Sequence, residues 1–263
     1  MKKILLVVVL ALVTLGAKAW TVQQDEGVVL LATKYLSPKA KMVVEEHLGT
    51  TYADDVAYLV KLEKRKQSPY SKNVHFLHLD ANLQPMVVEG DDALKSIKQA
   101  LAVVSASESH SKSDVTAALR TIINLMCDMH CISKIRIDGV AHSWHDFDVK
   151  RQVSASGSKE KEVSQSKWSS FWNLYAGLHR GFYGELWAED MDVCFGAKSG
   201  EFMQGTLSEW VSANGEIASK LYSKITPENT MLRIEFLELE DLHYEMMARA
   251  AYRIAALLNE NLK

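Results

Sequence analysis

Apolar residues recur at helical spacing along most of the chain. The most apolar stretch, Ala118 to Lys134, leaves almost no polar face. A helix of this kind is typically the buried centre of a helical domain. It nevertheless carries Asp128, with Asn124 one turn earlier on the same side. Because a buried carboxylate is costly unless a metal, a cation or several donors compensate it, we expect Asp128 to have such a partner.

The other periodic segments predict an all-α, mostly helical protein. Only four prolines interrupt the chain, and Ser37-Pro38 provides an N-cap followed by proline at the first helical position. Helices are expected at Glu26–Leu36, Pro38–Leu48, Tyr52–Lys66, Asp91–Ala106, Ser113–Ser133, Lys167–Phe182, Gly200–Tyr222 and Arg233–Asn261.

The pattern changes between Arg136 and Ser166. Residues 147–149 alternate as in a strand, and a polar stretch rich in serine and lysine follows. This indicates a hairpin or an exposed loop. We find no repeat, coiled coil or internal boundary in the sequence, so residues 20–263 are expected to form one helical domain with this small insertion.

Residues 1–19 have the features of a secretory signal peptide. Lys2 and Lys3 precede an apolar run, and Ala17-Lys18-Ala19 forms an A-x-A cleavage site. The run is too short for a membrane anchor, and no later run in residues 20–263 is long and apolar enough to span a membrane. The sequence therefore predicts a secreted or periplasmic protein that begins at Trp20.

The charge and the cysteine content exclude only a few classes of protein. The chain has 33 acidic and 30 basic side chains, which argues against general coating of a polyanion. Cys127, Cys131 and Cys194 allow at most one disulfide, so this is not a disulfide scaffold. Cys127 and Cys131 are four apart on one helix, and core packing is favoured over metal binding or oxidation.

Several segments together resemble a known family. A tryptophan follows the predicted cleavage site, and "ALRTIINLMCDMH" (Ala118–His130) resembles the motif A-L-x-F-L-V-H-x-x-G-D-x-H. Further similar segments are Leu36–Gly49, Ala53–Leu62, Val74–Asp80, Ser169–Asn173 and Ala250–Asn259. In order and spacing they resemble the S1/P1 nucleases, exported zinc-dependent single-strand nucleases related to bacterial phospholipase C. The resemblance implies a fold of the phospholipase C/P1 nuclease type.

The resemblance also implies a cleft with three zinc ions, which would activate water and neutralise charge on a phosphate ester. Of the family's ligand positions, Trp20, His75 and Asp128 match. Six of the nine carry a different residue: Asp25, Lys61, Asn124, Lys134, Ser169 and Asn173. A slipped register near Lys61 would offer Asp54 or Asp55 instead.

These differences imply a damaged metal centre, because zinc prefers imidazole, carboxylate or thiolate ligands. The site corresponding to Lys134, Ser169 and Asn173 should be empty. A second site would offer Lys61, His75, Asn124 and Asp128. The third, formed by Trp20, Asp25 and Asp128, is the least damaged. We expect no zinc or partial occupancy, and we expect Lys61 and Lys134 to pair with Asp128 and Asp25 in place of the metals.

Four further sets of side chains could have either a structural or a functional role. His75 and His78 are expected on one short strand, facing opposite sides, with His78 at the surface. His130 is expected to be structural. Phe76 is suited either to stacking on a nucleotide base or to core packing. The His- and Asp-rich residues 142–148 are interpreted as a chance motif rather than a metal site.

Two functions remain open. The favoured one is an exported, catalytically degenerate protein whose former metal cleft binds phosphate, nucleotide or another anion. The alternative is an active metal-dependent phosphodiesterase or endonuclease on single-stranded nucleic acid. It would use one or two ions at Trp20, Asp25, His75 and Asp128.

Overall fold

The structure is a computed structural model that describes residues 20–51, 53, 72–90, 92–154, 161–172 and 183–262. The predicted signal peptide (1–19), nearly all of the predicted helix Tyr52–Lys66, and the site positions Lys61 and Asn173 lie outside these residues. No helix in the described part combines the length and the apolar character needed to cross a bilayer.

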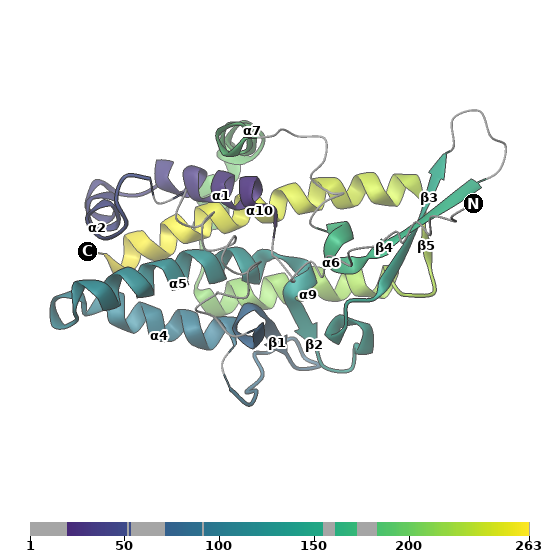
Figure 1. The fold of residues 1–263 in the computed structure, drawn as a ribbon, viewed down its shortest axis with the longest axis horizontal. Helices are drawn as coiled ribbons and strands as arrows, with labels where there is room; N and C mark the ends of the chain where they lie inside the picture. The colour runs from purple at the N-terminus through teal and green to yellow at the C-terminus, as the bar shows by residue number, and fades with distance from the viewer. Residues whose placement is uncertain are drawn as a thin grey trace, which may run out of the picture.

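The described protein is mostly helical, which confirms the prediction at that level (Figure 1). Its helices are α1 (Val22–Lys34), α2 (Pro38–Leu48), α4 (Ala93–Ser105), α5 (Lys112–His130), α6 (Trp168–Ser170), α7 (Gly184–Phe195), α8 (Ser199–Met203), α9 (Leu207–Lys224) and α10 (Arg233–Asn261). The strands are β1 (Leu77–Leu79), β2 (Ile135–Ile137), β3 (Asp148–Ser154), β4 (Lys161–Lys167) and β5 (Thr230–Met231).

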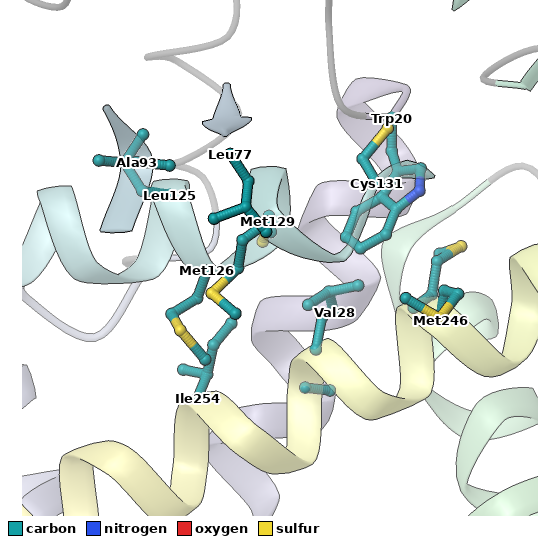
Figure 2. Packing of buried hydrophobic residues seen from close by; sticks show 14 of the residues in the cluster. Trp20, Val28, Leu77, Ala93, Leu125, Met126, Met129, Cys131, Met246 and Ile254 are labelled. Atoms are coloured by element: carbon teal, nitrogen blue, oxygen red, sulfur yellow. The ribbon is translucent and has the colours of Figure 1, made fainter. Parts of the chain in front are cut away.

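The core forms where α5 and α10 meet α1. These long helices run lengthwise through the molecule, and α4 packs along α5 (Figure 1). Figure 2 shows Val28 of α1, Met126 of α5 and Ile254 of α10 converging in this core. All three side chains are fully buried, so α5 lies between other elements on several sides. This is the environment that its nearly all-apolar surface predicts.

The strands form two small sheets. β1 and β2 pair in parallel, with Leu77 opposite Ile135. β3 and β4 form an antiparallel hairpin, and β5 joins the outer side of β3 in parallel. The hairpin confirms the first of the two interpretations of this region. It extends from the bundle beside the N-terminal end of α10 (Figure 1).

One predicted helix is divided in the structure, and one observed helix was not predicted. The single helix expected at Gly200–Tyr222 is two helices, α8 and α9. Gly205 has a φ of +94°, a conformation that ends the first helix, and Thr206 then caps α9 through a capping box with Glu209. Helix α7 was not predicted.

The ends of α5 and β1 also differ from expectation. α5 ends at His130, and a 3₁₀ helix, η3 (Ile132–Lys134), connects it to β2. His75 belongs to a second 3₁₀ helix, η1 (Lys72–His75), and not to the strand that carries His78. The prediction that both histidines lie on one strand was therefore wrong. Phe76 belongs to neither element and separates η1 from β1, so the strand starts only after His75.

Candidate functional site around Asp128

Asp128 lies in the last turn of α5 and contacts two side chains. The Nδ1 atom of His75 lies 2.6 Å from Oδ2 of Asp128, and Nζ of Lys134 lies 3.7 Å from Oδ1. The exposed fractions are 3% for His75, 3% for Asp128 and 1% for Lys134. Because an ionised carboxylate only accepts hydrogen bonds, Nδ1 of His75 is the donor. Asp128 thus has both a cation and a donor, as a buried carboxylate requires.

The chain after α5 folds back to bring Lys134 to this carboxylate. The backbone N–H of Cys131 donates to the carbonyl of Asp128 at 3.0 Å, and that of Lys134 donates to the carbonyl of Cys131 at 2.8 Å. These two short-range bonds form a tight turn. Lys134, six residues beyond Asp128 in the sequence, therefore returns to the same buried region.

Helix α9 holds this turn in place. The hydroxyl of Tyr222 donates to the carbonyls of Ile132 and Ile135, at 3.0 and 3.2 Å. The amide of Asn214 donates to the carbonyl of Met129 at 2.9 Å. Burial raises the pKa of Tyr222 beyond its usual range, so the phenol keeps its proton and remains a donor. The position of Lys134 therefore depends on a helix from a distant part of the sequence.

His75 reaches Asp128 through the parallel sheet. β1 begins two residues after His75, and β2 begins directly after Lys134. The register pairs Leu77 with Ile135. Since the strands run in the same direction, the residues that precede them lie at the same end of the sheet. His75 and Lys134 are brought to one carboxylate in this way.

An aromatic ring flanked by two cations lies next to the Asp128 cluster. Nζ of Lys134 lies 5.3 Å from the centre of the Phe76 ring, and the Arg136 guanidinium lies 4.1 Å from it. Both distances are within the range of cation–π attraction. Arg136 also donates a hydrogen bond to the carbonyl of Ser143. Burial lowers the pKa of Arg136.

His78 is buried, so the expectation of a surface position was wrong. Its ring lies 5.4 Å from that of Trp144, and its Nδ1 is 3.9 Å from Asp92. Burial is the main cause that lowers the pKa of His78, while the nearby Asp92 charge opposes this shift. The central residue of β1 is therefore covered by neighbouring loops and is packed in the interior.

The next two predicted site residues, Trp20 and Asp25, lie just before α1 and in its first turn. Trp20 is fully buried, and its ring lies 6.3 Å from that of His243 in an edge-on arrangement. Trp20 and Cys131 both belong to the buried core (Figure 2). Asp25 is also buried, in the first turn of α1. The charges of Asp25 and Asp128 both add to the effect of burial in raising the pKa of Cys127, so the two carboxylates act on the same thiol.

The remaining altered positions have other surroundings. The backbone N–H and the hydroxyl of Ser169 both donate to the carboxylate of Asp146, each at 2.8 Å. Ser169 and Lys134 thus bind different carboxylates. Asn124 is buried on α5, one turn before Asp128. Asn173 and Lys61 lie outside the described residues. The structure therefore brings together His75, Asp128 and Lys134, with Asp25 nearby.

The cluster contains both residue types that bind zinc and one that repels it. His75, Asp128 and Asp25 are residue types that bind zinc, whereas an ammonium repels it. Within the described ranges, no group of three or more His, Cys, Asp or Glu side chains is arranged to hold a metal ion. Cys127 and Cys131 are in thiol form, and burial raises the pKa of Cys131 to about 12.

A second buried polar network forms around His130, the last residue of α5. His130 donates from Nδ1 to the carbonyl of Met126, and its Nε2 accepts from Arg253 at 3.0 Å. Arg253 also donates to Asn214 at 3.1 Å. Burial holds the pKa of His130 well below its usual range, which keeps the ring neutral as its acceptor role requires. The structural role predicted for His130 agrees with this geometry.

Sequence reasoning missed several residues that shape the site: Asn214, Tyr222, His243, Arg253 and Asp146. No motif or spacing marks them, because their partners are distant in the sequence. Only the His- and Asp-rich residues 142–148 drew attention to Asp146, and they were interpreted as a chance motif.

A scan against protein-family models finds no match to this chain, and a search of curated proteins finds no relative.

Proposed function

We propose that the protein is a catalytically degenerate protein of the S1/P1 nuclease and phospholipase C type. In this proposal a lysine ammonium provides the positive charge that metal ions provide in the family. The observation that carries it is the buried pair of Lys134 and Asp128, with Nζ 3.7 Å from Oδ1. A lysine at this distance competes directly with a metal ion for the carboxylate.

The proposed role is that of an exported binding protein. Residues 1–19 would direct secretion or transfer to the periplasm, and cleavage would leave Trp20 at the N-terminus. The ligand would be phosphate, nucleotide or another anion bound near the former metal cleft. The half-buried pair of Arg136 and Phe76, whose guanidinium lies 4.1 Å from the ring centre, supports an anion, because a cation beside an aromatic ring suits a phosphate that carries a base.

Metal analysis of the exported, cleaved protein tests this proposal. After dialysis against metal-free buffer, elemental analysis should find fewer than two zinc ions per chain. Single-stranded DNA should remain uncut when zinc is added back. Three tightly bound zinc ions, or cleavage that a chelator abolishes, would overturn the proposal.

The alternative is a phosphodiesterase that works with one or two metal ions. In zinc sites a ligating histidine commonly donates its other ring N–H to a carboxylate, as Nδ1 of His75 does to Asp128 at 2.6 Å, and Asp25 and Trp20 would be further donors. Under this alternative, a chelator should lower the melting temperature of the wild type. Under the favoured proposal, chelator should leave the melting temperature unchanged.

A further inference from the structure

A cavity away from the Asp128 cluster lies between α9, α10 and the strands β3 and β5. Its volume is about 630 Å³. Its walls are mainly aliphatic, with Ile217 and Leu221 on α9, Ile225 directly after α9, and Leu239 and Leu242 on α10. The C-terminal end of α9 and the N-terminal end of α10 lie beside the hairpin (Figure 1). An open aliphatic cavity gains free energy when an apolar group displaces its water.

The size of the cavity points to a small ligand. Sites for small molecules typically enclose roughly 300–1,000 Å³, and this cavity falls within that range. We therefore consider a ligand whose apolar part fits between two helices.

The charges around the cavity favour an anionic end group. Lys150 of β3 and Lys220 and Lys224 of α9 line it, the latter two one turn apart. None of these three ammonium groups forms an ion pair with any other residue in the described ranges. A single carboxylate head placed among them would be attracted by all three.

Two carboxylates, Glu235 and Glu238, also line the cavity, from the α10 side. One of them is already engaged, because Glu235 accepts the backbone N–H of Leu232 at 2.6 Å and caps α10. Lys220 and Lys224 extend from α9, the helix on the other side of the cavity. Both carboxylates keep their negative charge, so the lining residues carry three positive against two negative charges, with the positive charges on α9 and β3 and the negative charges on α10.

We propose that this cavity binds a free long-chain carboxylate, one molecule per chain. Its alkyl chain would lie between α9 and α10, against Ile217 and Leu239. Its carboxylate would lie at Lys220 and Lys224, with Lys150 nearby. This site is separate from the anion site proposed near Asp128, and neither proposal depends on the other.

Calorimetric titration of the exported protein with dodecanoate, below its micelle concentration, tests the site. Dodecylammonium has the same chain and the opposite charge, so we expect it to bind at least about tenfold more weakly. The double variant Lys220→Glu with Lys224→Glu should reverse this preference. Its matched control is Lys39→Glu with Lys98→Glu, which makes the same charge change at exposed lysines of α2 and α4 and should bind like the wild type.

A second variant tests the apolar half of the site. Ile217→Trp fills the cavity and should abolish binding of both amphiphiles while the melting curve stays cooperative; Leu242→Trp serves if the first variant does not fold. The proposal is overturned if the wild type binds neither amphiphile or binds both equally. It is also overturned if the control double variant loses as much dodecanoate affinity as Lys220→Glu with Lys224→Glu. The same holds if Ile217→Trp binds dodecanoate as the wild type does. Binding of the wild type to dodecanoate in anionic vesicles, without binding to free dodecanoate, would overturn it as well.

Discussion

Lys134 is the residue on which the charge balance of the buried cluster depends. Lys134→Met would leave the Asp128 carboxylate buried with His75 as its main described partner. Breaking a buried pair in this way typically costs about 3 kcal/mol or more of unfolding free energy. Adding Asp128→Asn removes the stranded charge, so the double variant should be much milder than the sum of the two single variants. Denaturant unfolding of all four proteins should give a coupling energy of at least about 1 kcal/mol.

The control for this cycle is Lys39→Met, at an exposed lysine of α2, which should change stability little. Additive effects of Lys134→Met and Asp128→Asn would contradict the pairing. A rise in zinc affinity of Lys134→Met with unchanged stability would instead favour the metal-dependent alternative.

His243 should make the protein less stable in mild acid. Burial lowers its pKa to about 3, while an unfolded histidine titrates near its ordinary value of about 6.5. Below that value the unfolded chain takes up a proton and the folded protein does not, so the contribution of this residue to stability falls as the pH drops. Between pH 7 and pH 5 the loss from one such histidine is about 2 kcal/mol.

His243→Gln isolates this effect. The amide keeps a polar partner for Gln24, which lies 3.3 Å from the imidazole Nε2, but it does not titrate. The difference in unfolding free energy between pH 7 and pH 5 should therefore shrink by about 2 kcal/mol in the variant. His110→Gln, at an exposed histidine, should leave the difference as in the wild type. An unchanged difference in His243→Gln would contradict the prediction.

The need of Asp128 for a partner could be predicted from the sequence, because the helix around it has almost no polar face. The identity of the partner could be predicted only in part. Lys61 and Lys134 were both expected, and the structure places Lys134 at the carboxylate, whereas Lys61 lies outside the described residues. The contact with His75 spans 53 residues and depends on the pairing of two three-residue strands. Such short strands leave no periodic pattern in a sequence.

Among the elements, local capping decided which predictions succeeded. α2 begins after Ser37, whose side chain accepts the N–H of Ala40, and its predicted bounds are those observed. The bounds of α10 were also predicted correctly. α8 and α9 were merged because the apolar pattern continues across Gly205, although Thr206 and Glu209 carry a recognisable capping box. α7 was missed because only Gly184, Trp187 and Met191 are buried on it, too few for a clear period.

Helices α1 and α7 approach so closely that Gly27 leaves no room for a side chain. A Cβ at this position would lie 2.4 Å from Cβ of Trp187 and 3.0 Å from the carbonyl oxygen of Gly184. Neither atom is the end of a flexible side chain, so the helices must move apart. We expect Gly27→Ala to destabilise the protein by about 1–3 kcal/mol in denaturant unfolding.

Gly200 provides the matched control for this substitution. It is also helical, in α8, but a Cβ there meets open space. Gly200→Ala should be neutral or stabilise the protein by up to about 1 kcal/mol, because alanine favours the helix. Equal effects of the two substitutions would show that the approach of α1 and α7 does not limit the size of residue 27.

At the scale of the whole molecule, the alkylation rates of the cysteines measure global unfolding. Cys194 is exposed, while Cys127 and Cys131 are buried and burial raises the pKa of both. Iodoacetamide at neutral pH should therefore modify Cys194 of the native protein first. The other two thiols should react at least about a hundredfold more slowly, since they must wait for unfolding. Mass spectrometry of the alkylated protein measures both rates.

A Cys194→Ser variant sharpens this measurement. It should remain unmodified under native conditions and become doubly modified in denaturant. Rapid native labelling of Cys131 would mean that the end of α5 opens without global unfolding, contrary to the hydrogen bonds from α9 that hold it.

The hydrogen bonds between the two ends of the described chain have a consequence for its biosynthesis. Gln24 of α1 contacts His243, and the backbone N–H of Ser37 donates to Asn259 at 2.6 Å, a separation of 222 residues. These contacts of α1 and α2 therefore cannot form until α10 has been made, many seconds later at ordinary elongation rates. Until then the apolar side chains of α1 and α2 that pack against α10 stay accessible to chaperones.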